Sequence, residues 1–369
     1  MNILNTQLSK LIEEEYLYYN DLDTKIKKNL KKGLSEEIDY NKIRHILDDI
    51  QDPHFQIINP KMRKFFLELP LAIVGENIIV AEKCEKYPQI KKGDVLKKIE
   101  GRGIEEILAQ YGRFNTITLR LIKILDLISR NDKPGKITLE FETESELYIK
   151  EKIEYILYDT VWLKELKMNA SSQTDIVKNK TGVKYVKVPS LMDDKSVEMI
   201  VNELESWSYQ TPVIFDLRYN LGGKISNAVK LLQFFIEERT EIYLKSRKNM
   251  ECISVLPKKS KIKENKMGVL INNLTCSSLE FVFLRNILNV KDIVLIGEET
   301  CGMLDVATVY QLNPNYIMNM TTKKYVESNG VVIKEKAITP QIILKNQIND
   351  IRKNKDSQLI QALEILRKS

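Results

Sequence analysis

The sequence has few of the features that mark membrane, secreted or metal-binding proteins. It contains no run of about eighteen apolar residues, so no membrane-spanning helix is predicted. Its four cysteines form no CxxC pair and show no paired spacing, which argues against a disulfide framework or a zinc site and favours reduced thiols. The first residues, MNILNTQLSKLIEEEY, lack the basic start and apolar centre of a signal peptide, so we expect a cytoplasmic protein.

An excess of one charge sign is also missing. The 57 Lys and Arg residues nearly balance the 51 Asp and Glu residues, and the net charge of +6 is spread over the whole length. The densest basic runs, at 27–32 and 257–266, are not interleaved with aromatic residues as a surface for single-stranded nucleic acid would be. We therefore expect no nucleic-acid partner and no membrane partner. The composition is that of a globular protein, and 369 residues suggest two or three domains.

Three parts follow one another along the chain. Residues 1–50 have helical periodicity and predict a helical N-terminal subdomain, with a fresh helix starting at Ser35. Residues 51–150 change to short strands and predict a small β-rich module. Residues 151–369 alternate strands with helices, which predicts an α/β core with a mostly parallel sheet and a long C-terminal helix over 349–367. The fold class is thus α/β, or α+β for the chain as a whole.

Within these parts, several elements can be placed from the pattern. In the β-rich module we expect a strand at 95–99, helices at 104–110 and 114–129, and a strand at 135–141. The polar stretch 169–181 is expected to be a loop or linker. In the α/β core, strands are expected at 183–188, 212–217, 268–272 and 293–296, with Ser226 capping the helix after the second of them.

One strand, turn and helix is organised like a nucleophile site. The buried strand 268–272 leads into a polar turn, and apolar residues then recur at helical spacing. Such a turn lifts a hydroxyl out of the sheet edge, and the first amides of the helix can hold an oxyanion. Ser277 or Ser278 is therefore a candidate nucleophile. The same residues, with Glu280 nearby, are also ordinary helix caps, and the residues alone leave both interpretations open.

Two other features are candidates for the same site. Gly222 and Gly223 follow a buried strand and could present backbone amides to a ligand, or could simply form a turn that needs positive φ. His54 follows an Asp-Pro pair at a turn from helix to strand, where it could be a positioned base or an ordinary loop residue. His45, the other of the two histidines, lies in a helical pattern and is expected to be structural or exposed.

Taken in order, these segments resemble the C-terminal-processing (tail-specific) serine peptidases. The resemblance is carried by segments similar to that family's Asp-Leu-Arg-x-Asn-Pro-Gly-Gly motif, its Ser-Ala-Ser-Ala-Ser-Glu segment and its Val-Gly-Glu-x-Thr-x-Gly strand: VIFDLRYNLGG (213–223), INNLTCSSLEF (271–281) and IVLIGEETCG (293–302). Leu221 replaces the usual proline. An opening strand VKYVKVPSL (183–191) and a closing strand GVVIKEKAITPQI (330–342) are also similar, and IKKGDVLKKIEGRGIEEIL is similar to the core of a PDZ-like domain.

One position decides which branch of the family the chain resembles. Many members carry a lysine base directly after Thr-x-Gly, but here that position is Met303, whose thioether cannot serve as the base. The branch that includes the tricorn core instead uses Ser, His and Glu. The resemblance therefore implies Ser277 as the nucleophile, His54 as the base and Glu335 as the acid.

The same resemblance implies the rest of the chemistry. Backbone N–H groups of Gly222 or Gly223 and of Ser278 would stabilise the oxyanion. Cys276 is conceivable as the nucleophile, but the register of the motif puts the attacking atom one residue later. The implied substrate is a peptide or protein tail, with no cofactor and no metal. A non-catalytic peptide-binding protein of the same fold and an acyl hydrolase acting on a non-peptide substrate are the alternatives. The oligomeric state is left open.

Overall fold

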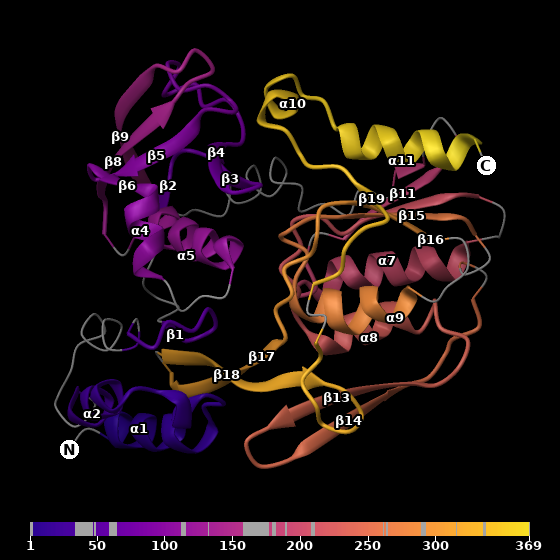
Figure 1. Cartoon of the computed structure of the whole chain (residues 1–369), viewed down its shortest axis with the longest axis horizontal. Coiled ribbons are helices and arrows are strands. Elements are labelled where there is room, and N and C mark those ends of the chain that lie inside the picture. Colours follow the sequence, from indigo (N-terminus) through magenta and orange to yellow (C-terminus); the bar gives the residue numbers. More distant parts are fainter. Residues whose placement is uncertain are drawn as a thin grey trace. The chain divides into compact units, whose positions relative to one another are not determined.

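The structure is a computed structural model of the whole chain (Figure 1). It describes residues 3–368 apart from 34–46, 48, 59–64, 112–115, 132, 158–176, 179–181, 189, 208–210, 261, 263–264, 289–292, 315 and 335–336. The chain divides into two compact units. Unit 1 comprises Met1–Tyr158, Leu244–Met250 and Asp305–Lys324, and unit 2 comprises Asp159–Tyr243, Glu251–Leu304 and Tyr325–Ser369. The predicted starting helix at Ser35 and most of the predicted linker lie outside the described residues.

Unit 1 begins with the helices that the periodicity predicts. These are α1 (Ile3–Glu15), the short 3₁₀ turn η1 (Tyr19–Asp21) and α2 (Thr24–Gly33). Leu8 and Ile12 of α1 are buried in one cluster with Phe55 and with Met318 and Met320. The helical face therefore packs on a sheet surface supplied by a much later part of the chain.

The largest sheet of unit 1 has eight strands. Its order is β3-β4-β5-β8-β9-β2-β7, with β6 on β5. The strands are β2 (Phe65–Leu67), β3 (Leu71–Val74), β4 (Asn77–Val80), β5 (Val95–Ile99), β6 (Arg102–Gly103), β7 (Arg130–Asn131), β8 (Gly135–Glu142) and β9 (Tyr148–Leu157). Helices α4 (Ile104–Gln110) and α5 (Ile117–Ser129) accompany them, so the predicted strands and helices of this module are confirmed.

Strand β9 is an addition that the pattern did not predict. Its sequence is dense in Lys and Glu, and by itself it is typical of solvated surface. The charges are matched across the ladder: Lys150 lies 3.2 Å from Glu140, and Lys136 lies 2.8 Å from Glu154. Opposite charges on facing strands stabilise such a pair modestly, and only the partner strand supplies them.

A second sheet of five strands was also not predicted. Its order is β1-β18-β13-β14, with β17 on β18. The strands are β1 (Gln56–Ile58), β13 (Thr240–Ser246), β14 (Met250–Val255), β17 (Asp305–Asn313) and β18 (Tyr316–Val326). The predicted strand that starts near Phe55 is confirmed as β1, which pairs antiparallel with β18 in the register Gln56↔Asn319.

Unit 2 contains the mostly parallel sheet that the alternating pattern predicts. Its order is β10-β11-β12-β15-β16-β19, and all neighbours from β11 to β19 are parallel. The strands are β10 (Val177–Lys178), β11 (Lys184–Lys187), β12 (Val213–Asp216), β15 (Met267–Ile271), β16 (Ile293–Gly297) and β19 (Ile342–Ile343). Strands β12 and β15 are buried at every residue, which explains their continuous apolar sequences.

Helices cover both faces of this sheet (Figure 1). The described helices of unit 2 are α7 (Asp194–Ser206), α8 (Ile225–Leu232), the π-helix η3 (Leu279–Leu284), α9 (Arg285–Ile287), α10 (Ile348–Arg352) and α11 (Ser357–Lys368). Ile214 of β12 packs with Ala362 and Leu366 of α11. The next residue, Phe215, points to the other face, where its ring lies 5.3 Å from that of Phe235. Successive side chains of this strand thus pack against opposite faces of the sheet.

Two predicted helix boundaries are wrong. The C-terminal helix expected over 349–367 is two helices, because Asn354 has φ +53° and Asp356 starts α11 by accepting a hydrogen bond from the Leu359 N–H at 3.0 Å. Ser226 does not cap α8: the N-cap is Lys224, with no side-chain cap, and Ser226 lies inside the helix. In both places the observed helix start differs from the one that local propensity predicts.

Candidate active site

The candidate site is built from two loops at the carboxyl ends of neighbouring parallel strands. Strands β12 and β15 pair in the register Asp216↔Leu270, so the loop before α8 and the loop before η3 leave the sheet at the same edge. The loops are tied together: the Cys276 N–H donates to Asn220 O at 3.0 Å, and Thr275 Oγ1 donates to Leu217 O at 3.0 Å. The geometry of the second loop is therefore set by the first.

Ser277 occupies the strained position of this turn. Its φ is +56°, in the left-handed region that a non-glycine residue seldom adopts, and Ser278 immediately returns to helical values. Ser277 is half-buried, whereas Ser278 is buried and its hydroxyl donates to Gly223 O at 2.9 Å. Of the two serines that the pattern left open, the geometry favours Ser277 as the available hydroxyl and gives Ser278 a structural bond.

Gly222 allows the first loop to press against the serine turn. Its φ is +90°, and a Cβ there would lie 2.8 Å from both Cys276 O and Ser277 Cβ. A larger residue would fit only if the backbone moved. Gly222 is therefore needed both for the positive φ of the turn and for the close approach to the serine loop. The Gly222 N–H donates to Asn220 Oδ1 at 2.8 Å. Three backbone amides are expected to stabilise an oxyanion, and that of Gly222 already donates a hydrogen bond within its own loop. The amide of Gly223 follows it in the same loop, and that of Ser278 lies in the loop before η3.

Cys276 is placed where it would be a poor nucleophile. Its side chain is fully buried, and burial raises the pKa of the thiol well above its ordinary value, with the neighbouring Cys301 thiol acting in the same direction. A thiol that stays protonated at neutral pH does not attack a carbonyl efficiently. The geometry therefore favours Ser277 over Cys276.

Glu280 joins the π-helix after the serine to the segment after β16. It is fully buried, accepts a hydrogen bond from Thr300 Oγ1, and accepts the Gly302 N–H at 3.0 Å and 3.1 Å on its two oxygens. Burial raises the pKa of its carboxyl to about 8. Single π-turns inside helices are frequent at functional sites, and here the carboxyl stabilises the helix that directly follows the Ser277 turn.

We expect Glu280 to make stability fall with rising pH. Its pKa is near 4.5 in the unfolded chain and about 8 in the folded one, so between these values only the folded protein keeps the proton. The favourable contribution is complete below about pH 4.5 and is lost as pH rises through about 8, a change of roughly 3–5 kcal/mol in the free energy of unfolding. Glu280→Gln has no proton to lose and should remove this dependence. Urea unfolding of both proteins at pH 5 and pH 8 tests this, and equal pH dependence would contradict it.

His54 belongs to unit 1 and is held by its own surroundings. Its backbone N–H donates to Asp52 Oδ1 at 2.8 Å, and its ring Nδ1 lies 3.1 Å from Thr321 Oγ1. The His54 side chain is 17% exposed, so the ring is largely enclosed but still reachable. The sequence reasoning missed Thr321, which lies 267 positions away on β18 and has no local motif. Glu335 lies outside the part of the chain that the structure describes.

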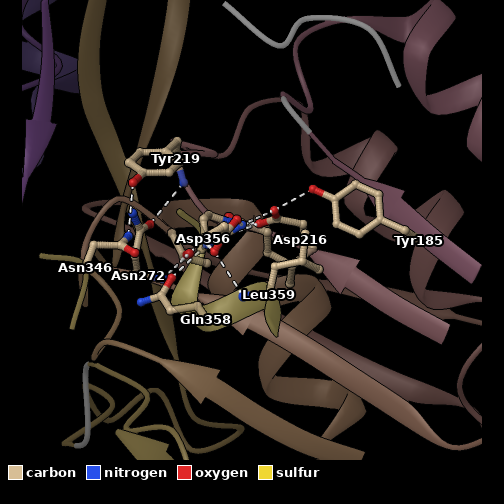
Figure 2. A network of polar contacts seen from close by, with 11 residues as sticks. Tyr185, Asp216, Tyr219, Asn272, Asn346, Asp356, Gln358 and Leu359 are labelled. Carbon is tan, nitrogen blue, oxygen red and sulfur yellow. Dashed lines mark hydrogen bonds and ion pairs between the residues drawn. The ribbon is translucent and has the colours of Figure 1, made fainter. Parts of the chain in front are cut away.

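A buried charge network fixes the strand end from which the first loop leaves (Figure 2). Arg218 donates to Asp216 at 2.6 and 2.9 Å and to Asp356 at 2.7 and 2.8 Å. Tyr185 OH donates to Asp216 Oδ2 at 2.7 Å, and the Tyr219 N–H donates to Asn272 Oδ1 at 3.0 Å. Asp216 and Arg218 therefore form a bidentate pair, and the network continues to Asp356 at the N-terminus of α11.

The fold and the strained serine turn define the class: an α/β protein with a serine-peptidase fold. Residues 182–344 match the model of peptidase family S41. This match lies in the part of the chain that carries the serine turn, and the resemblance to C-terminal-processing peptidases is confirmed.

Comparison with known proteins agrees with this assignment. A probable CtpA-like serine protease of Staphylococcus epidermidis is 24% identical over 344 residues, covering 91% of this chain and 66% of that protein. One of Staphylococcus aureus is 23% identical over 331 residues, covering 85% and 61%. The chain thus spans about two-thirds of the length of these relatives.

Solved structures share the fold. Mature CPAF has a TM-score of 0.71 at 14% identity, over 98% of this chain and 95% of that one. The photosystem II D1 C-terminal processing protease has a TM-score of 0.59 at 15% identity, over 99% and 97%. No helix in the described ranges combines the length and apolarity that crossing a bilayer requires.

Proposed function

We propose that the protein is a serine endopeptidase that cleaves peptides or unstructured protein tails. The observation that carries the proposal is the left-handed Ser277, held between a buried strand and a helix start with Gly222 pressed against it. This geometry exposes one hydroxyl beside backbone amides, which is what acyl transfer needs. The match to the model of peptidase family S41 and the likeness to CtpA-like serine proteases support the same reaction.

In the proposed mechanism, Ser277 Oγ attacks the scissile carbonyl carbon while His54 takes its proton. The imidazolium then gives the proton to the leaving amine, an acyl-enzyme remains, and water releases the acyl group with His54 again acting as base. The amides of Gly223 and Ser278 would stabilise the oxyanion, each worth about 3–4 kcal/mol when well aimed. The Gly222 amide is not available for this role, because it donates to Asn220 Oδ1. A carboxylate behind His54 would orient the ring, and the family resemblance implies Glu335 for this role.

The proposed substrate is an extended chain. A peptide can add as a strand to an exposed sheet edge, where main-chain hydrogen bonds give affinity with little sequence demand. The β-rich module, whose sequence is similar to a PDZ-like core, is the proposed place for such recognition. All four cysteines are free thiols, which suits a reducing compartment, and we propose cytoplasmic action on this basis. Recovery of the native protein from a secreted fraction would contradict that location.

Labelling with a serine-directed phosphonate tests the proposed reaction. We expect covalent modification of the intact protein, mapped by peptide mass spectrometry to Ser277, because only an activated serine reacts with such reagents. Cys276→Ala is the matched control, since it alters the neighbouring residue and should keep the label. Turnover of extended peptides rather than simple esters would support the endopeptidase. Ester turnover alone would favour the acyl hydrolase, and neither label nor turnover would favour a non-catalytic peptide-binding protein.

A further inference from the structure

We propose that Thr321 and Asp52 are positioning residues that hold His54 in the tautomer a general base needs. This inference rests on the proposed function, because it concerns the histidine that function uses. The family resemblance implies that Glu335 orients the ring through His54 Nδ1. We assign this role to Asp52, which acts through the Thr321 hydroxyl.

The contact is made by strand pairing. Asp52 lies in the turn just before β1, and Thr321 lies on β18, the strand with which β1 pairs. Thr321 Oγ1 is 3.1 Å from His54 Nδ1 and donates to Asp52 Oδ1 at 3.0 Å. Thr321 is fully buried and Asp52 is 8% exposed, so water competes little with either bond.

The directions of these hydrogen bonds determine the tautomer. An ionised carboxylate only accepts, and the threonine hydroxyl has one proton, which goes to Asp52 Oδ1. The Thr321 oxygen is left to accept, so the group opposite it must be an N–H on His54 Nδ1. A neutral imidazole has one N–H, and placing it on Nδ1 leaves the Nε2 lone pair free to take a proton. Nε2 is the atom that a base acting on Ser277 would use.

Two acidic side chains of unit 1, Asp52 and Asp305, interact with His54. Asp52 Oδ1 is 3.9 Å from His54 Nδ1, close enough to stabilise an imidazolium through the hydroxyl between them. Asp305 on β17 also acts on His54; burial raises the pKa of Asp305, while the Tyr18 hydroxyl, His54 and Lys324 oppose that rise. Tyr16 faces Asp52, and its phenol stays protonated because burial, with Asp52 adding to it, raises its pKa.

A tautomer measurement on the full chain tests the relay without using activity. His45→Gln leaves His54 as the single histidine, because the chain has two. With ¹⁵N-histidine labelling, a long-range ¹H–¹⁵N spectrum of the neutral ring shows which nitrogen carries the proton. We expect the Nδ1–H form in this background. Thr321→Val, which removes the hydroxyl but keeps the shape, should shift the ring towards the Nε2–H form, and Thr321→Ser should restore Nδ1–H.

Peptide turnover gives the second readout. Thr321→Val should lower kcat by about 10- to 100-fold and Asp52→Asn by about 10²- to 10⁴-fold, with KM little changed and Thr321→Ser recovering most of kcat. Unchanged tautomer in Thr321→Val overturns the relay, whatever the activity. A tautomer change caused by Glu335→Gln but not by Thr321→Val also overturns the relay, because Glu335 would then be the group that accepts the hydrogen bond from His54 Nδ1. A tautomer change in a protein with no hydrolytic activity supports the relay and contradicts the proposed function instead.

Discussion

Replacing Ser277 with alanine should lower kcat/KM for an extended peptide by at least about 10⁴-fold. The reason is that no second hydroxyl or thiol can take its place. Ser278 already donates its hydroxyl to Gly223 O at 2.9 Å, and Cys276 is buried with a raised pKa. Residual turnover would come from the backbone amides and from substrate binding. Steady-state kinetics on a fluorogenic peptide measures the change.

Two neighbouring substitutions are the controls for this result. Ser278→Ala removes one structural hydrogen bond between the loops and should cost far less activity than Ser277→Ala. Cys276→Ala should retain most turnover, because its thiol is not positioned to react. If Ser277→Ala keeps near-normal activity while either control abolishes it, the nucleophile has been assigned to the wrong residue.

Replacing Arg218 with methionine should lower the free energy of unfolding by about 3–5 kcal/mol. The guanidinium is 7% exposed and bridges Asp216, which is 2% exposed, to Asp356 (Figure 2). Its loss would leave two carboxylates facing each other, one of them deeply buried and without its cation. Urea unfolding measures the loss. Peptide turnover should fall as well, because the network lies at the end of β12, where the loop that carries Gly222 begins.

A second arginine provides the matched control. Arg239 lies 2.8 Å from Glu241 in a pair whose side chains are 60% and 37% exposed. Solvent screens such a pair, so Arg239→Met should change the free energy of unfolding by no more than about 1 kcal/mol. If both variants lost a similar free energy of unfolding, the buried Arg218 network would stabilise the fold no more than an exposed ion pair does.

Much of unit 2 could be predicted because its signals are local. Residues 213–215 of β12 and Met267–Ile271 are continuous apolar runs, and parallel strands buried on both faces require that composition. Gly222 and Gly223 follow such a strand and do adopt positive φ. The order of these segments also placed Ser277 at the turn where the structure finds a left-handed residue.

The unpredicted elements depend on partners far along the chain. Strands β9, β13, β14, β17 and β18 carry polar or mixed sequences, and their strand character depends on what pairs with them. The break between α10 and α11 has the same origin, because Asp356 starts α11 while also binding Arg218, 138 positions earlier. Local sequence propensity cannot predict a contact between residues so far apart in the chain.

The sequence by itself determined the parallel sheet, the position of the serine turn and the resemblance to the peptidase family, because each depends on residues close together in the chain. Only the tertiary structure decided which serine hydroxyl is available and what holds His54. Thr321 and Asp52 lie 269 positions apart, and they meet because β1 pairs with β18. A hydrogen bond closed by strand pairing over that separation leaves no periodicity or motif behind, since its geometry exists only in the folded chain.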